Sequence, residues 1–191
     1  VRLPQERQNL LFSATMPKEV EGLVQDFLPN AERVQIGTRS QSAKTITHRF
    51  AAVAAVDKQD ALERLLQREP GRVLIFVNKK IGCEKLGNSL KRAGFPADAI
   101  HGDKGAEARH SCLQAFSRGK VRILVATDVA ARGIDVDDIE LVVNYDFPLG
   151  LEDYVHRSGR TGRAGRTGRA LSLVAPMEHR LYEVVAAHLQ G

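Results

Sequence analysis

The chain has 191 residues, 43% of them hydrophobic and 27% charged, which is enough to bury the core of one compact domain or slightly more. No apolar run approaches membrane-spanning length and no signal-peptide pattern is visible, so we expect no membrane partner. Cys83 and Cys112 have no Cys or His neighbours at metal-ligand spacing. We therefore expect reduced thiols in a cytoplasmic protein, and no metal site.

The net charge of +5 is concentrated in one stretch. Residues 156–169, "HRSGRTGRAGRTGR", hold five Arg and no acid, which leaves 23 basic against 23 acidic residues elsewhere. Positive charge concentrated in one segment indicates a binding site rather than a general surface for coating nucleic acid. The stretch is compatible with a disordered Arg/Gly tail, a fibrous repeat, or placed cations for a polyphosphate. The fibrous repeat is excluded because the glycine period is short and proline is absent.

The first 37 residues predict a strand, a helix and a strand: "NLLFSAT", a helix starting at Pro17, and "ERVQIG". One such unit cannot bury both faces of its own sheet. We therefore expect residues 1–37 to be the C-terminal fragment of a larger first domain. The polar residues 38–45 predict a linker, and residues 46–191 predict a second domain.

In the second domain, β-branched runs alternate with amphipathic segments. The segments predict a helix capped by Asp57, a helix over 106–117 and two further helices, over 80–93 up to Gly94 and over 178–189. The apolar runs predict buried strands at 72–77, 121–126, 139–145 and 169–174. The alternation predicts an α/β fold with a parallel sheet and helices on both faces. Ligands bind such sheets at the carboxyl ends of the strands.

The stretch "ATDVAARGIDV" (126–136) follows one of these strands. Thr127 and Asp128 should stand at the ligand edge, Arg132-Gly133 allows a tight turn, and Asp135 offers a carboxylate of the kind that binds ribose hydroxyls. Alternatively, Asp128 caps a short helix and Asp135 lies in a solvated turn.

The basic stretch begins in a predicted helix over 151–160, which aims some of its cations. His156 and Arg160 share the side opposite the apolar residues, and Arg163 follows near the same side. Guanidiniums suit phosphate oxygens because they donate in pairs and keep their charge. A solvated Arg-rich loop is the alternative.

Arg109 points into the apolar stripe of the helix over 106–117, where a charge needs a partner or an anion. It lies in the first helical turn, and His101-Gly102 exposes backbone donors beside it. The alternative is an arginine whose head reaches solvent at the helix edge. The chain has no G-x-x-x-x-G-K-[S/T] cradle and no acidic pair for magnesium, so the cations predict half of a phosphate site.

Taken in order, "SAT" (13–15), "VLIFVN" (73–78), "HGD" (101–103), "ATDVAARGIDV" and "YVHRSGRTGRAG" (154–165) resemble the later motifs of DEAD-box ATP-dependent RNA helicases, in particular their bacterial branch. In that family two RecA-like domains close over ATP and single-stranded RNA. The resemblance implies that this chain is the second RecA-like domain with the end of the first. ATP and Mg²⁺ would then be held mainly by the first domain, and this chain alone would be inactive.

The resemblance also implies roles for individual residues. Arg160 and Arg163 would reach the γ-phosphate, and His156 would contact the first domain. Asp135 and Gly133 would lie near the nucleotide, and Ser13 and Thr15 would couple nucleotide state to RNA binding. The implied RNA contacts are Asn78, His101, Gly102, Arg109, Thr127 and Arg132. Ala106 and Lys79 depart from the family's usual Gln and Thr. A RecA-like module that only binds RNA or a protein is the alternative function.

Overall fold

The computed structural model of the protein describes residues 4, 6–13, 16, 18–34, 45–131, 136, 138–163 and 165–190. The chain divides into two units, Val1–Gln41 and Ser42–Gly191. No helix within the described ranges is both long and apolar enough to cross a bilayer.

The first unit contains the predicted helix, α1 (Lys18–Phe27). The two strands predicted beside it are wrong where they are described, because residues 9–13 and 32–34 form no strand. A strand needs a neighbour for its backbone groups, and the described part of this unit contains none. Phe12 and Val34 are accordingly 90% and 82% exposed. Residues 14–15 and 35–37 of these predicted strands lie outside the described residues.

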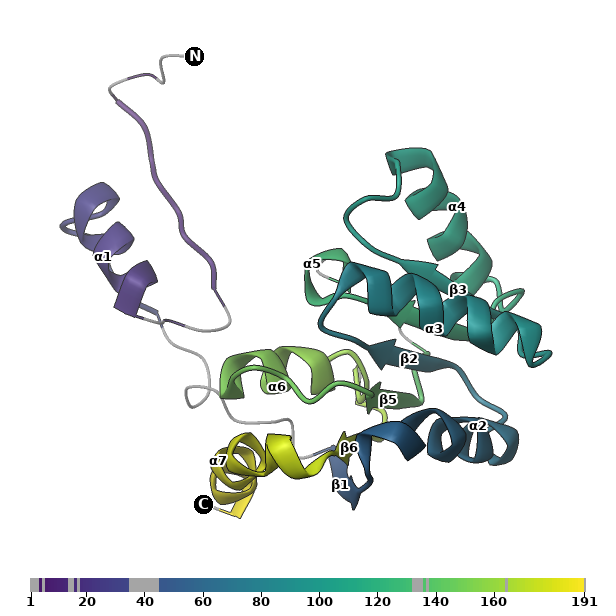
Figure 1. Ribbon diagram of the computed structural model, residues 1–191. Helices are drawn as coiled ribbons and strands as arrows, with labels where there is room; N and C mark the ends of the chain where they lie inside the picture. The colour runs from purple at the N-terminus through teal and green to yellow at the C-terminus, as the bar shows by residue number, and fades with distance from the viewer. Residues whose placement is uncertain are drawn as a thin grey trace. The chain divides into compact units, whose positions relative to one another are not determined.

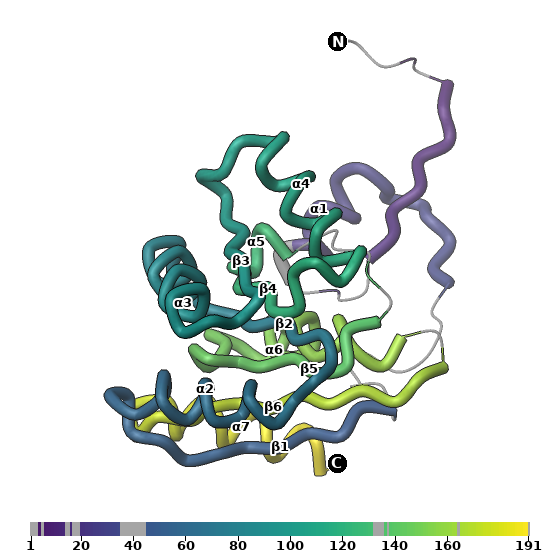
Figure 2. Tube along the Cα trace, turned by 90° about the vertical axis from the view of Figure 1, so that its right-hand side faces the viewer, coloured from purple at the N-terminus to yellow at the C-terminus, as the bar shows by residue number. Residues whose placement is uncertain are grey.

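The second unit is built on a parallel six-stranded sheet, in the order β1-β6-β5-β2-β4-β3 (Figures 1 and 2). The strands are β1 (Ile46–Ala52), β2 (Val73–Phe76), β3 (Ala97–Ile100), β4 (Ile123–Ala126), β5 (Leu141–Asn144) and β6 (Gly168–Val174). The four predicted strands are confirmed. Strands β1 and β3, which lie at the two edges of the sheet, were not predicted. Neither carries a continuous apolar run, because polar residues interrupt β1 and Asp98 interrupts the short β3.

Helices cover both faces, as predicted. The two faces of the sheet pack in two separate hydrophobic cores. Val73 and Ile75 of β2 lie in the first core, and Leu74 and Phe76 lie in the second. The first core includes α2 (Lys58–Arg68) and α3 (Lys80–Arg92), and the second includes α4 (Ala106–Ser117) and α5 (Asp128–Ala131). A third cluster joins α6 (Leu151–Ser158) and α7 (His179–Gln190) to β1 and β6. Two short 3₁₀ turns, Ala55–Asp57 and Pro176–Glu178, precede α2 and α7.

The ends of these helices agree only partly with the sequence signals. Gly94 and Gly119 have φ angles of 86° and 75°, so they end α3 and α4 as expected. Asp57 occupies the N-cap position of α2 but makes no capping hydrogen bond with its side chain. Its φ and ψ of −96° and −5° are turn values, whereas a capping side chain usually requires extended backbone. The predicted cap is therefore wrong.

Candidate functional site

One buried side chain, Arg157, links helix α6 to the carboxyl edge of the sheet, and it is 1% exposed. Its guanidinium contacts both carboxylate oxygens of Asp128, at 2.6 and 2.7 Å. The remaining donors reach the side-chain oxygens of Asn78 (2.7 Å) and Asn144 (3.3 Å) and the carbonyl of Asp146 (2.8 Å). All five N–H groups thus have acceptors, which is the condition for burying this charge.

The sequence analysis missed this role of Arg157, although a signal was present. Arg157 stands three residues after Tyr154, on the packed side of its helix, where a charge requires a partner. Asp128, predicted either to face a ligand or to cap a helix, begins α5 and is that partner. The Arg157 network therefore joins α6 to the residues that follow β2, β4 and β5.

His156 and Arg160 line one small pocket with Asp128, Asp153 and Phe76. His156 lies in α6 and Arg160 two residues beyond its end, and the two side chains line this pocket together, as predicted. Burial lowers the pKa of Arg160, and the nearby charge of Arg163 lowers it further. The guanidiniums of Arg160 and Arg163 are thus close enough for the charge of one to affect the pKa of the other.

Two residues, Thr161 and Gly162, fix the chain that follows α6. The hydroxyl of Thr161 donates a hydrogen bond to the backbone carbonyl of Ile139, at 2.5 Å. Gly162 has a φ angle of 68°, and a Cβ there would lie 2.8 Å from Cγ1 of Ile46. Arg163, one residue later, donates from Nε to the carbonyl of Gly159, at 3.1 Å. The two packed residues hold the backbone that carries Arg163.

The last two arginines of the basic stretch have other partners. Arg166 forms an exposed ion pair with Asp138. Arg169 is the second residue of β6, and its two terminal nitrogens contact both carboxylate oxygens of Glu69, at 2.6 and 2.8 Å. The five arginines therefore occupy distinct positions in a folded segment, in contrast to a disordered Arg/Gly tail.

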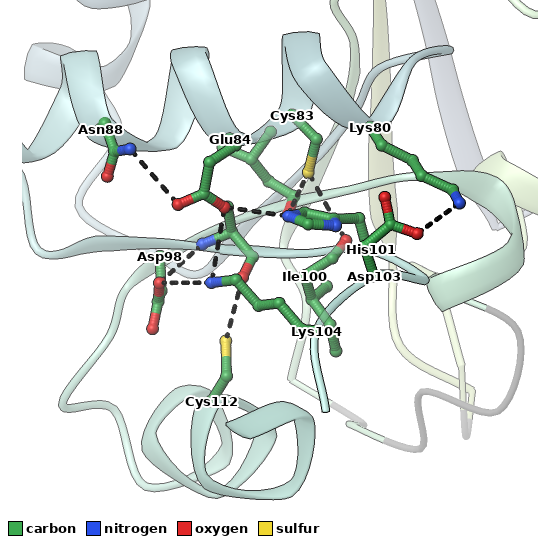
Figure 3. Close-up of polar contacts among 12 residues, drawn as sticks. Lys80, Cys83, Glu84, Asn88, Asp98, Ile100, His101, Asp103, Lys104 and Cys112 are labelled. Carbon is green, nitrogen blue, oxygen red and sulfur yellow. Dashed lines mark hydrogen bonds and ion pairs between the residues drawn. The ribbon is translucent and has the colours of Figure 1, made fainter. Parts of the chain in front are cut away.

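Helix α3 and the loop from β3 to α4 form a second polar cluster (Figure 3). Nε2 of His101 lies 3.0 Å from a carboxylate oxygen of Glu84, and this hydrogen bond is the main reason that the pKa of Glu84 is lowered. Nζ of Lys104 lies 3.7 Å from Oε2 of Glu84 and 3.6 Å from Oδ1 of Asp98. Nδ1 of His101 and Nε of Arg109 are buried and have no hydrogen-bond partner within the described part of the chain.

The other predicted site residues are placed as follows. Thr127 directly follows β4 and is 6% exposed. Asn78 donates from its side chain to the carbonyl of Phe147 at 3.1 Å and accepts from Arg157, so both of its polar groups serve the fold. Ser13 is exposed. Its partner in the SAT motif, Thr15, lies outside the described residues, as do Arg132, Gly133 and Asp135.

Comparison with known proteins decides the family. Residues 57–165 match the family described as "Helicase conserved C-terminal domain". The crystal structure of the E. coli DEAD-box protein SrmB bound to RraA is 38% identical, with a TM-score of 0.69, over 74% of this chain and 84% of that chain. The chain belongs to the DEAD-box helicase family. Residues 57–165 match its C-terminal helicase domain, and the α/β fold of the second unit is RecA-like, as the motifs predicted.

Two further relatives show how much of a helicase this domain represents. DEAD-box ATP-dependent RNA helicase 46 of Arabidopsis thaliana is 49% identical over 164 residues, which is 84% of this chain and 25% of that protein. Dbp5 of S. cerevisiae, bound to RNA and ADP BeF3, is 32% identical with a TM-score of 0.86, over 98% of this chain and 50% of that chain. The chain thus spans a quarter to a half of the length of these two relatives. The matches include plant and bacterial proteins, so the bacterial branch stays a prediction.

Proposed function

We propose that this chain is the C-terminal half of an ATP-dependent RNA helicase that unwinds or remodels RNA duplexes. The observation that carries the proposal is the position of Arg160, which lines a small pocket with His156 and whose pKa is lowered by burial and by the charge of Arg163. The negative charge of a polyphosphate would stabilise both guanidiniums. Planar guanidiniums suit its oxygens, because each donates two parallel hydrogen bonds and keeps its charge.

In this proposal the two guanidiniums stabilise charge that develops on the transferred phosphoryl group. His156 contacts the first RecA-like domain of the same protein, and Asp135 with Gly133 contacts the nucleotide. ATP supplies the transferable phosphoryl group, and Mg²⁺ neutralises its oxygens when bound. The described residues contain no group of three or more His, Cys, Asp or Glu that could hold a metal. We assign the magnesium ligands to the first domain because the resemblance to the family implies it.

The RNA contact is proposed for the edge that carries Gly102, Thr127 and Arg132, together with the buried nitrogens of His101 and Arg109. Buried polar atoms without a partner are rare in proteins and call for an explanation. Two of them, on His101 and Arg109, occur between β3 and the first turn of α4, where the resemblance implies contacts with the RNA backbone. Asn78 is proposed as a contact at the same edge, although its side chain already serves the Arg157 network.

The remaining assignments concern organisation. We propose that residues 1–37 belong to the first RecA-like domain and residues 38–45 to the linker, and that Ser13 and Thr15 couple ATP to RNA. The partners are then RNA and that first domain, in the cytoplasm. The chain alone should not hydrolyse ATP, because the predicted phosphate cradle lies in the other domain.

The experiment is steady-state RNA-stimulated ATPase of the full-length protein. Arg160→Ala and Arg163→Ala should each lower kcat by roughly three to five powers of ten and change ATP affinity far less. Lys at either position should not restore activity, because an ammonium cannot reproduce the planar fork. Arg166→Ala and Arg169→Ala are the matched controls and should leave kcat within a few-fold. Equal losses at all four positions would contradict the assignment, and a full-length protein without ATPase would indicate a binding module.

A further inference from the structure

An exposed ion pair lies over Gly102, at the edge proposed for RNA. Lys80 is the first residue of α3, and its Nζ lies 2.5 Å from Oδ1 of Asp103 (Figure 3). A Cβ on Gly102 would stand 3.6 Å from Cε and 3.8 Å from Nζ of Lys80. The lysine side chain therefore covers the face of Gly102, and its ammonium is held there by the neighbouring carboxylate.

The ion pair of Lys80 with Asp103 is more exposed than the contacts of Lys104 in the same cluster, so Lys80 can exchange its partner more easily. The side chains of Lys80 and Asp103 are 55% and 65% exposed, whereas that of Lys104 is 23% exposed and lies between two carboxylates. Exposed ion pairs contribute little to stability and break readily. Lys80 can thus leave Asp103 at small cost, while Lys104 is fixed by Glu84 and Asp98.

We propose that Lys80 is an RNA-backbone contact that Asp103 holds over Gly102 until a phosphate replaces the carboxylate. The proposal rests on the proposed function, since it places RNA at this edge. A phosphate that binds at Gly102 lies next to the Lys80 ammonium. The lysine can then leave the carboxylate of Asp103 and pair with the phosphate. Asp103 acts as a competitor for Lys80, and it weakens RNA binding by the free energy of the ion pair.

The test measures the affinity of the full-length protein for a labelled single-stranded RNA of mixed sequence, with a non-hydrolysable ATP analogue, across about 50 to 200 mM salt. Asp103→Asn should tighten binding about two- to five-fold, the range that an exposed ion pair supports. Lys80→Ala should weaken binding several-fold and reduce the salt slope by about 0.7, the value for one phosphate contact on a single strand. In the double variant, Asp103→Asn should give no gain.

The matched control is Lys91→Ala. Lys91 lies in the last turn of α3, is 46% exposed and pairs with Asp98 at 2.8 Å, so the variant makes the same charge change far from Gly102. It should leave affinity and slope nearly unchanged. If Lys80→Ala behaves like Lys91→Ala, the proposal is wrong. It is also wrong if the double variant binds as the wild type does, because Lys80 would then only neutralise Asp103.

Arg109→Ala separates this inference from the proposed function. A loss of affinity in Arg109→Ala together with no effect of Lys80→Ala would overturn the Lys80 contact alone. No effect of either variant on RNA affinity would overturn the RNA site at this edge.

Discussion

Two arginines three residues apart, Arg157 in α6 and Arg160 just beyond its end, differ in burial and partners. Arg157 is buried and has an acceptor for every N–H group, whereas Arg160 lines a pocket beside Arg163. The sequence predicts one helix over 151–160 and sets Arg160 apart from the side of Tyr154, but it assigns no side to Arg157, and α6 ends at Ser158. The sequence does not reveal the acceptors of Arg157, because Asp128, Asn78 and Asp146 follow three different strands. Such partners are known only once the strand order is known.

Removing Arg157 should destabilise the domain strongly. Arg157→Ala leaves the carboxylate of Asp128 and the amides around it without their donor, so the free energy of unfolding should fall by about 3–5 kcal/mol. Arg157→Lys should recover only part of this loss, because one ammonium cannot reach all the acceptors. The measurement is urea unfolding followed by circular dichroism.

Arg166→Ala is the control for Arg157→Ala within the same basic stretch. Its ion pair with Asp138 joins side chains that are 63% and 50% exposed, so the loss should stay below about 1 kcal/mol. Equal losses in the two variants would show that the Arg157 network does not hold α6.

At the scale of elements, prediction succeeded where an element carries its own pattern. Helices α3 and α4 were bounded within a residue or so, because apolar spacing and a following glycine mark them. The four central or covered strands were found from continuous apolar runs. Strands β1 and β3 were missed because their register and burial depend on neighbours. The strands expected at 9–15 and 32–37 had the pattern but, where they are described, have no neighbouring strand.

The segment after α6 allows a matched comparison of two glycines. Gly162 and Gly165 have φ angles of 68° and 77°, but a Cβ at Gly162 would contact Ile46 at 2.8 Å, whereas a Cβ at Gly165 would have no atom within 4 Å. Gly165→Ala should cost about 1–2 kcal/mol, from backbone conformation alone. Gly162→Ala should cost more, because it also pushes the segment away from β1. Urea unfolding measures both, and equal losses would mean that the contact with Ile46 relaxes freely.

For the whole molecule, the third apolar cluster introduces a dependence of stability on pH. Nδ1 of His48 in β1 lies 2.6 Å from the hydroxyl of Tyr154 in α6, and burial lowers the pKa of His48 below 6.5. The unfolded chain therefore takes up a proton on His48 at a higher pH than the folded chain does. Stability from this group is complete above the unfolded pKa and is lost as the pH falls below about 6.5.

We therefore expect the free energy of unfolding to decrease between pH 7.5 and 5.5, and His48→Gln to reduce that decrease. Urea unfolding at several pH values tests this. The carboxyl groups of Glu84 and Asp103, whose pKa values are lowered by hydrogen bonds from His101 and Lys80, lose their contribution only at more acidic pH. An unchanged slope in His48→Gln would assign the decrease to other groups.

The pairing of β1 with β6 has a consequence for synthesis of the protein. The first strand of this domain lies at the sheet edge beside the last one, and Lys58 and Glu178, which join the two ends of the domain by a 2.7 Å ion pair, are 120 positions apart. Contacts between distant segments form slowly, and a growing chain exposes its unpaired strands until their partners arrive. During translation, β1 cannot pair with β6 until nearly the entire domain has been synthesised. This edge of the domain is therefore completed last, and it is the part that a chaperone would have to shield.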